Sequence, residues 1–372
     1  MTSHSTVFLY GTLCDLTLLE IVAGEAVQAS PATLGDHAVF WAKDQSFPII
    51  VEVDGETAEG ILVEISAAAK ARLDFYEVGF GYYLLPCTVV QGEVETAAEA
   101  YFAKPRRWTP GARWSLTDWQ SEFGILTREA AGDYIGLYAK KTPQEAAQLF
   151  GQVRNRAASR LRARMSPSPS AFDPSPTRED VAIKSSHRPL MDFFDVVEET
   201  LQFQTFAGGR SNEVQRISLL AGDAVTVLPY DPATDQVLVI RQFRHGAFSR
   251  GDANPWCVEP AAGRIDPFET PEDAALRELR EETGVVARDL HRIASYYPTP
   301  AAVSEHLTSF VATCDLSGKD GHIGGLAGEN EDIMSHVIPF SSLMDLVQSG
   351  AANTGPLVLS ALWLQNERHR LG

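Results

Sequence analysis

Residues 263–285 read Gly-Arg-Ile-Asp-Pro-Phe-Glu-Thr-Pro-Glu-Asp-Ala-Ala-Leu-Arg-Glu-Leu-Arg-Glu-Glu-Thr-Gly-Val, and this stretch decides the fold of the second half of the chain. Glu278, Glu281 and Glu282 are spaced by three and four residues, which places their side chains on one face of an α-helix. Like charges at these spacings destabilise a helix by roughly 0.2–0.5 kcal/mol per pair. A divalent cation would turn the same cluster into a binding site, and carboxylate oxygens suit Mg²⁺ or Mn²⁺.

The ends of this helix are also marked in the sequence. Thr270 is the predicted N-cap, Asp273 three residues later suggests a capping box, and Pro271 falls at the first helical position. Gly284 is predicted to end the helix. Arg277 lies one turn before the second of the three glutamates, so we expect an ion pair between them.

The stretch resembles the Nudix box, Gly-x5-Glu-x7-Arg-Glu-U-x-Glu-Glu-x-Gly-U with U an aliphatic residue, at every defined position. The resemblance implies a hydrolase that needs Mg²⁺ or Mn²⁺ and cleaves a nucleoside diphosphate linked to another group. It assigns Glu278 and Glu282 as the main metal ligands, with Glu282 also counted as catalytic, and the Ala262 carbonyl as a further ligand. Glu281 is implied as a ligand or as a residue that orients one.

Length and charge limit the remaining interpretations. The chain has 372 residues, 44% of them hydrophobic, and this length fits two domains with real cores. Its net charge of −18 argues against sequence-independent binding of nucleic acid, which requires a basic surface. A small anionic substrate stays possible, because a bound metal supplies positive charge locally.

The cysteines and the hydropathy pattern predict a cytoplasmic protein. Cys14, Cys87, Cys257 and Cys314 are far apart and form no Cys-x-x-Cys motif, so we expect reduced and mostly buried thiols. The N-terminus lacks a basic segment of the kind that opens a signal peptide. No apolar run approaches the roughly 18 residues that a membrane span needs.

Residues 165–180 predict the boundary between the domains. They hold four prolines among serines, a composition that favours an extended linker over a helix or a sheet. We therefore expect an N-terminal domain at 1–164 and a C-terminal domain at 181–372. Residues 143–164 predict one helix with a basic end, which is interpreted as a solvated or docking face, with nucleic-acid contact as the alternative.

The C-terminal domain is predicted to be an α/β/α sandwich with a mixed sheet, as the Nudix resemblance implies. Strand-like runs occur at 193–197, 201–206, 223–228 and 237–243, and residues 231–235 form a turn between the last two. A second helix is expected at 341–348. Phe193 or Phe194 is a candidate for stacking on adenine, with a place in the core as the alternative.

Residues beyond the box indicate the substrate. Pro300 follows the box at the distance found in the ADP-ribose pyrophosphatase subgroup, whose loop continues to a Ser-Glu pair that matches Ser304 and Glu305. By this resemblance Glu305 contacts the substrate. Ala301 and Ala302 stand where the subgroup has small residues or glycine, and alanine resists a positive φ.

The same subgroup has an acidic loop that residues 328–333 resemble. The resemblance assigns Glu329 as the catalytic base and Glu331 as an additional metal ligand, with a polar surface turn as the alternative. Arg216 and Arg244 are candidate partners for the diphosphate, or else structural residues paired with acids. Glu259 is left open as a substrate contact or a structural residue.

The resulting hypothesis is hydrolysis of ADP-ribose to AMP and ribose 5-phosphate. The alternatives are another nucleotide sugar such as GDP-mannose, or a sensor that binds ADP-ribose without cleaving it. A homodimer through the Nudix domain is expected from the subgroup, and no nucleic acid or membrane partner is expected. The pairing of domains also resembles Nudix fusions associated with bacterial tellurite resistance.

The N-terminal half holds a short strand that breaks at a glycine, in Tyr10-Gly11-Thr12-Leu13, where free backbone amides can hold an oxyanion. With the runs at 47–51, 59–64 and 73–83, it resembles the γ-glutamylcyclotransferase-like (AIG2-like) family over residues 6–105. That resemblance implies a small mixed β-barrel with flanking helices, a γ-glutamyl site at Tyr10–Leu13, and Glu77 as the group that takes a proton from the substrate amine. Leu84 stands where the family often has arginine, so the substrate stays open, and a domain that binds without turnover is the alternative.

Overall fold

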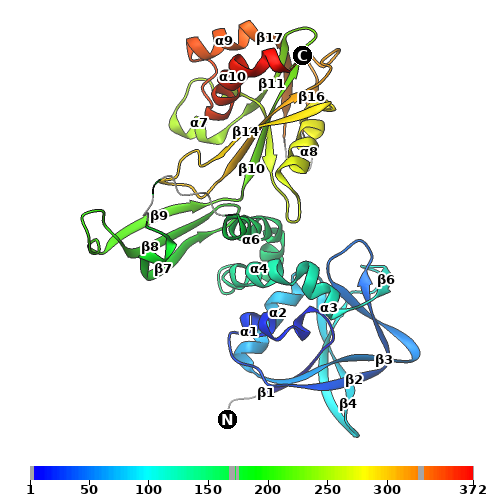
Figure 1. Ribbon diagram of the computed structural model, residues 1–372. Coiled ribbons are helices and arrows are strands. Elements are labelled where there is room, and N and C mark those ends of the chain that lie inside the picture. The colour runs from blue at the N-terminus through cyan, green and yellow to red at the C-terminus, as the bar shows by residue number, and fades with distance from the viewer. Residues whose placement is uncertain (1–3, 167–171, 173–175, 326–330, 372) are drawn as a thin grey trace. The chain divides into compact units, whose positions relative to one another are not determined.

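The computed structural model describes residues 4–166, 172, 176–325 and 331–371 (Figure 1). The chain divides into two compact units: residues 1–167 with 191–193 form unit 1, and residues 168–190 with 194–372 form unit 2. The linker at 165–180 stays a prediction, since 167–171 and 173–175 lie outside the described residues.

Unit 1 is built on a six-stranded mixed sheet. Its strands are β1 (His4–Leu9), β2 (Ala29–Ala42), β3 (Pro48–Ser66), β4 (Tyr82–Gln91), β5 (Val94–Ala103) and β6 (Pro110–Arg113). They follow the order β3-β1-β5-β4-β2-β6, and β2 also pairs with β3. The β1–β5 pair is parallel, whereas the other pairs are antiparallel. The predicted mixed sheet is confirmed, and the description as a barrel stays a prediction.

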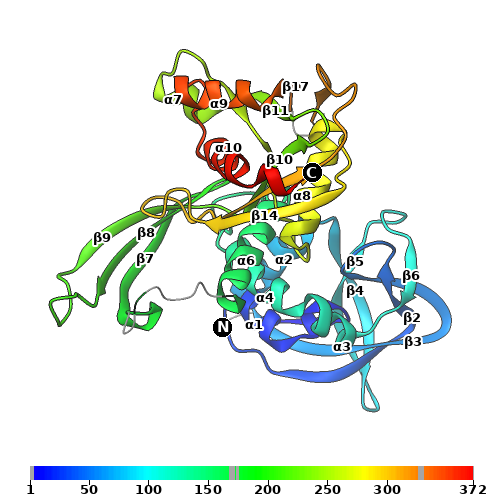
Figure 2. The ribbon, with the colours of Figure 1, turned by 45° about the horizontal axis from the view of Figure 1, so that its top comes forward.

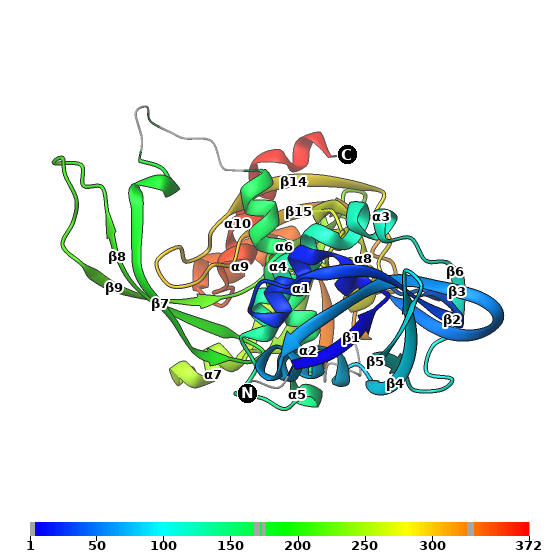
Figure 3. The same cartoon turned by 90° about the horizontal axis from the view of Figure 1, so that it is seen from below.

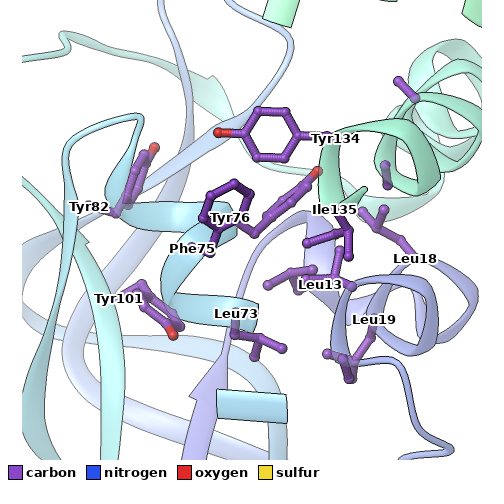
Figure 4. Close-up of a cluster of buried hydrophobic side chains, with 14 of the residues drawn as sticks. Leu13, Leu18, Leu19, Leu73, Phe75, Tyr76, Tyr82, Tyr101, Tyr134 and Ile135 are labelled. Atoms are coloured by element: carbon purple, nitrogen blue, oxygen red, sulfur yellow. The ribbon is translucent and has the colours of Figure 1, made fainter. Parts of the chain in front are cut away.

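Helices pack against this sheet and bury the main core of unit 1. They are α1 (Leu16–Ala23), α2 (Ala67–Val78), α3 (Leu116–Trp119), α4 (Ile125–Ile135), α5 (Pro143–Gln148) and α6 (Phe150–Met165). Figure 4 shows Tyr76 of α2 beside Tyr134 of α4, with leucines of α1 in the same cluster of buried side chains. Figure 3 shows α1, α4 and α6 beside one another, and α4 contacts both of the other helices.

The prediction of one helix over 143–164 is wrong, because the structure has two. α5 ends at Leu149, which adopts φ −91° and ψ 0° and bonds the carbonyl of Ala146 only three residues back. The helix then resumes as α6 at Phe150. The basic end of α6 docks on α4, where Arg160 pairs with Glu129 at 2.6 Å, so the docking interpretation fits better than nucleic-acid contact.

Unit 2 is centred on an eight-stranded mixed sheet. Its strands are β10 (Ala224–Asp231), β11 (Gln236–Phe243), β12 (Trp256–Glu259), β13 (Ala261–Arg264), β14 (Asp289–Tyr296), β15 (Leu307–Thr313), β16 (Ile323–Gly324) and β17 (Ile333–Pro339). The order is β14-β15-β10-β11-β17-β16, with β12 on β11 and β13 on β10. β10 runs parallel to β15 and antiparallel to β11 across the predicted turn.

Helices cover both faces of this sheet, as the alternation of buried residues requires. Val225 and Leu238 point into the core under α8 (Pro271–Thr283), whereas Leu228 and Val237 point into the core under α9 (Phe340–Ser349) and α10 (Gly355–Glu367). In Figure 2 the strands β10 and β14 run between α8 and α10. The predicted α/β/α sandwich is therefore confirmed, and α10 is a helix that the sequence analysis missed.

Unit 2 also contains a three-stranded sheet of β7 (Val181–Met191), β8 (Asp195–Phe203) and β9 (Val214–Leu220). The two strands predicted at 193–197 and 201–206 are one strand, β8. No turn residues separate those two runs, so the strand continues to Phe203, just before a turn at Thr205–Gly208. A short helix, α7 (His245–Arg250), follows β11. Among the described residues, no helix is both long and apolar enough to cross a membrane.

Candidate functional site

The carboxylate-bearing helix α8 begins and ends at the predicted residues. The hydroxyl of Thr270 accepts a hydrogen bond from the amide of Asp273, and Pro271 is the first helical residue. The capping box is only half formed, because the Asp273 carboxylate accepts from the Thr270 hydroxyl at 2.6 Å. Gly284 ends the helix in the left-handed conformation, with φ 63°, which glycine adopts without strain.

The three glutamates of α8 differ in burial. Glu282 is only 2% exposed, and one of its carboxylate oxygens accepts a hydrogen bond from the amide of Ala262 on β13 at 2.9 Å. The side chain of Glu278 is 14% exposed, whereas that of Glu281 is 30% exposed. The structure thus brings Glu278, Glu282 and the backbone of Ala262 together, with Glu281 at the edge.

Gly263 on β13 makes room for Glu278. A Cβ atom at position 263 would lie 1.9 Å from the carboxyl carbon of Glu278, far inside van der Waals contact. The Glu278 carboxylate therefore occupies the volume in which a side chain of residue 263 would lie. A side chain at position 263 would therefore have to displace this carboxylate, which is the end of a flexible side chain.

Arg277 holds the acidic residues of the site in place. Its guanidinium makes a two-pronged pair with Glu269 at 2.9 Å for both contacts, a geometry that arginine favours with carboxylates. The same group contacts Glu278 at 2.7 Å and Glu281 at 3.2 Å. The predicted Arg277–Glu281 pair is confirmed, and the role of Glu269 was missed, although its fixed offset from Arg277 was a signal.

Burial changes the acidity of these groups. Burial, with a smaller contribution from the charge of Glu331, raises the pKa of Glu278 to about 7 and the pKa of Glu282 to about 8. Partial burial opposes ionisation of Glu269 as well, but hydrogen bonds from Arg277 hold the pKa of Glu269 below its usual value. Among the described residues, Glu282 makes no ion pair, whereas Arg277 pairs with Glu269, Glu278 and Glu281.

The donor set fits a divalent cation. In the arrangement observed, no three Asp, Glu, His or Cys side chains within the described ranges are close enough to hold a metal ion, and Arg277 contacts both Glu278 and Glu281. Burying carboxylates without a compensating charge is costly. Oxygen ligands are those that Mg²⁺ and Mn²⁺ prefer. A bound cation would therefore relieve the strongest electrostatic conflict in the site.

The candidate diphosphate arginines lie in different surroundings. Arg244 directly follows β11 and pairs with Glu259 at 2.6 Å. Its positive charge offsets part of the rise in the pKa of Glu282. It therefore lies near the carboxylate cluster, and Glu259 is its partner. Arg216 lies on β9 in the three-stranded sheet, where its guanidinium donates to the carbonyl of Gln215. Nothing in the described part of the chain brings Arg216 to the glutamates of α8.

The loop after Pro300 is fixed by hydrogen bonds to β9. Leu219 donates to the carbonyl of Ala302 at 2.8 Å and accepts from the amide of Ser304 at 2.9 Å. Neither Ala301 nor Ala302 has a positive φ, so alanine causes no strain there. Glu305 pairs with Arg264 of β13 at 2.6 Å, which ties the loop to the strand that also carries Ala262.

The acidic loop is only partly described. Glu329 lies outside the described residues, so its assignment as the base stays a prediction. Glu331 lies two residues before β17 and interacts electrostatically with Glu278 and Glu282. Phe193 and Phe194 are 56% and 41% exposed, which excludes a place for either ring in a buried core.

A second candidate site is a cavity of about 320 Å³ inside unit 1. The loop Tyr10–Leu13 and Glu77 of α2 both line it, so the structure brings together the residues predicted to act in this domain. Glu77 is half-buried, and burial raises its pKa to about 7. Among the described residues, none donates a hydrogen bond to this carboxylate.

Three of the four tyrosines that line the cavity donate hydrogen bonds to other protein groups. The hydroxyl of Tyr10 donates to the carbonyl of Tyr101, and the hydroxyl of Tyr101 donates to Asp74 at 2.6 Å. Tyr82 donates to the carbonyl of Pro48 at 3.0 Å. Thr12–Cys14 form a single 3₁₀ turn after Gly11. The cavity therefore offers one carboxyl group without a partner inside a rigid aromatic frame.

Two family models match the chain in separate places. A model of the NUDIX domain matches residues 220–354, and a model described as gamma-glutamyl cyclotransferase, AIG2-like, matches residues 7–121. An ADP-ribose pyrophosphatase of Haemophilus influenzae is 34% identical over 191 residues, which cover 51% of this chain and 88% of that protein. The chain belongs to the Nudix family. Along the chain, the Nudix domain follows an AIG2-like domain.

Other relatives of the Nudix domain have two different names. An ADP-ribose pyrophosphatase of Escherichia coli K12 is 33% identical over 188 residues, or 50% of this chain and 89% of that protein. A GDP-mannose pyrophosphatase of Pectobacterium atrosepticum is 32% identical over 138 residues, or 37% of this chain and 70% of that protein. The similarity to proteins named for ADP-ribose thus extends further than the similarity to this protein named for GDP-mannose.

Proposed function

We propose that unit 2 hydrolyses ADP-ribose to AMP and ribose 5-phosphate. The observation that carries this proposal is a complete Nudix box whose carboxylates are buried and positioned on α8, within a region similar to ADP-ribose pyrophosphatases over most of their length. A protein that only bound the nucleotide would have no need for this arrangement.

Glu278 and Glu282 would hold Mg²⁺ or Mn²⁺, with the Ala262 carbonyl and Glu331 as further ligands. A bound divalent ion neutralises the diphosphate and polarises a phosphorus atom. Arg277 orients Glu278 and Glu281 through its hydrogen bonds, as partners behind metal ligands commonly do.

The attack on the diphosphate requires a base. Glu329 would take a proton from the attacking water, whose oxygen would bond the attacked phosphorus while the bridging oxygen leaves with the other phosphate. Arg244 lies near the cluster and would contact the diphosphate, although this requires it to share its charge with Glu259. Glu305 and Arg216 are the remaining candidate contacts to the substrate.

A product screen tests this proposal. ADP-ribose, GDP-mannose and NADH should each be incubated with the full-length protein and Mg²⁺, with AMP or GMP measured by chromatography. ADP-ribose should have the highest kcat/KM. A preference for GDP-mannose would assign the protein to that substrate and leave the role of α8 unchanged. Tight binding of ADP-ribose without any product would support a sensor.

A second proposed activity belongs to unit 1. We infer that the cavity converts a γ-glutamyl compound to 5-oxoproline, because Glu77 faces it without a hydrogen-bond partner among the described residues and the AIG2-like model matches there. The deprotonated carboxylate would take a proton from the α-amine and make it nucleophilic. Release of 5-oxoproline from a panel of γ-glutamyl amino acids and amines tests this activity, and binding without release would indicate a ligand-binding domain.

The three-stranded sheet of unit 2 supports a homodimer. It exposes apolar side chains, among them Ile183, Leu190 and Ile217, which are 50%, 49% and 58% exposed. Exposed apolar side chains favour association where they gather on one surface. Sedimentation velocity should give a dimer that Ile217→Lys weakens; a concentration-independent monomer would contradict it.

The four free cysteines support a reducing compartment such as the cytoplasm.

A further inference from the structure

The cavity of unit 1 is completed by helices that lie beyond the AIG2-like match. That match ends at residue 121, but Thr127 of α4 and both Phe150 and Arg154 of α6 line the cavity. The loop Tyr10–Leu13 and Glu77, on which the cyclotransferase proposal depends, line the same cavity. If the γ-glutamyl group binds beside the loop Tyr10–Leu13 and Glu77, the rest of the ligand would contact side chains of α4 and α6, which the family match does not include.

The charged residues of the cavity indicate what such a ligand carries. Of the residues that line it, three bear ionisable acid or guanidinium groups: Glu77, Arg107 and Arg154. Arg107 is exposed, and its guanidinium makes no ion pair with an acid in the described part of the chain. Arg154 is partly buried on α6. Two guanidinium groups beside one carboxyl group favour a ligand with an anionic group of its own.

The surfaces beside these arginines are flat and apolar. The guanidinium of Arg154 lies 5.8 Å from the centre of the Phe150 ring, and Phe150 meets Phe80 edge to face at 4.9 Å. On another wall, Phe47 meets Trp108 at 5.0 Å, and Arg107 lies over the Trp108 ring. Aromatic walls of this kind bind planar apolar groups.

We propose that Phe150 and Arg154 of α6 form a subsite for the leaving half of the γ-glutamyl compound, and that this half is an amino acid with a flat apolar side chain. Its carboxylate pairs with Arg154, and its side chain packs on Phe150. The inference rests on the proposed cyclotransferase function of unit 1, and it names the substrate class for that site: γ-glutamyl amino acids rather than γ-glutamyl amines.

The reaction that this subsite serves is balanced without water. The α-amine of the γ-glutamyl group attacks the carbonyl carbon of its own side chain, which forms the carbon–nitrogen bond of 5-oxoproline. The amide bond to the leaving amino acid breaks. One proton moves from the attacking amine, by way of Glu77, to the nitrogen of the leaving amino acid. The free amino acid is then held by the pair between its carboxylate and Arg154 until it dissociates.

A matched pair of ligands tests the subsite in the full-length protein. γ-Glutamyl-phenylalanine and γ-glutamyl-phenethylamine differ only in the carboxylate. The affinities of the two ligands are measured by calorimetry in the Glu77→Gln variant, because loss of the base should leave the ligands uncleaved. The kcat and KM for the two compounds are measured in the protein that retains Glu77. The carboxylate should improve affinity and KM by roughly 10- to 100-fold, as a charge-assisted pair does.

Substitutions on α6 separate the subsite from the fold. Arg154→Gln should raise KM for the phenylalanine compound by the same factor, leave kcat nearly unchanged, and have no effect on the phenethylamine compound. Arg154→Lys should restore part of the loss. Phe150→Leu should weaken both ligands. Arg164→Gln is the matched control, because Arg164 lies on the same helix, pairs with Glu129 and does not line the cavity.

The outcomes distinguish this inference from the cyclotransferase proposal. Binding that depends on the carboxylate and on Arg154, but without release of 5-oxoproline, would reject the enzyme and keep the subsite. Turnover with equal KM for the two ligands would keep the enzyme and overturn the subsite. A carboxylate preference that survives in Arg154→Gln, or no binding of either ligand, would also overturn it.

Discussion

The two candidate sites contain carboxylates that burial makes less acidic, yet their surroundings differ. On α8, burial raises the pKa of Glu282 to about 8, and Glu278 and Glu331 add negative charge nearby. In unit 1, burial alone raises the pKa of Glu77 to about 7 among aromatic side chains. In the first environment carboxylates outnumber the guanidinium groups, whereas the second holds a single acid that can exchange a proton. The same desolvation therefore supports metal binding in one unit and proton transfer in the other.

The largest effect should come from Glu282→Gln. The amide keeps the size of the side chain and the hydrogen bond to Ala262 but removes a charged ligand, so kcat for ADP-ribose should fall by roughly 10³-fold or more, as loss of several kcal/mol implies. AMP release with Mg²⁺ measures it. Glu281→Gln, at a less buried position, should lose less activity. Full activity in Glu282→Gln, or in EDTA, would contradict the metal assignment.

Glu77→Gln should affect only the other unit. Loss of a general base lowers rates by roughly 10²- to 10⁴-fold, so release of 5-oxoproline should fall by that factor while hydrolysis of ADP-ribose is unchanged. In the unsubstituted protein, kcat/KM for the cyclotransferase should rise with pH to a plateau above about pH 7, because the base form of Glu77 then predominates. A pH-independent rate would reject Glu77 as the base.

A smaller effect is expected from Arg277→Lys, which keeps the charge but loses the two-pronged contact with Glu269. Partners that orient metal ligands are worth roughly 10- to 100-fold in metal affinity or activity, so the Mg²⁺ concentration for half-maximal rate should rise within that range. Arg280→Lys, an exposed change on the same helix, is the control. Equal Mg²⁺ dependence in both variants would show that Arg277 does not orient the metal-binding glutamates.

The pH dependence of thermal stability should report the raised pKa of Glu77 in unit 1. Because the folded protein raises the pKa of Glu77 from 4.5 to about 7, the stability linked to its protonation is present in full below about pH 4.5 and is lost as the pH rises through about 7. Glu77→Gln, which cannot ionise, should therefore raise Tm by several degrees at pH 8 and change it little at pH 5. Scanning calorimetry measures this. Exposed Glu64→Gln is the control, and a shift that is equal at both pH values would contradict the assignment.

The smallest effect should follow from separating the units. Residues 178–372 contain the whole box and its sheet, so this fragment should hydrolyse ADP-ribose at close to the full-length rate. Cyclotransferase activity of residues 1–165 should not depend on Mg²⁺. A C-terminal fragment with a native circular-dichroism spectrum but little activity would show that unit 1 regulates the Nudix site.

The sequence was sufficient for local features and insufficient for contacts between distant segments. Helix α8, its caps and its carboxylate face follow from spacing, and so does the Arg277–Glu281 pair. The pair of Arg264 with Glu305 joins residues 41 positions apart, and no local pattern specifies it. The α6 wall of the cavity depends on how two helices fold back on unit 1. Helix α10 was missed, although Thr354-Gly-Pro marks its start.

The shared volume of Gly263 and Glu278 has a consequence for comparing relatives. The two positions lie on a strand and a helix, yet only one of them can carry a side chain at that point. They should therefore vary together during evolution. In a relative that keeps the glutamate, a side chain at this strand position would push the carboxylate aside, whereas a relative that has lost the glutamate is free to fill the space from the strand. The residue at position 263 is thus a marker of whether a related chain has kept this carboxylate.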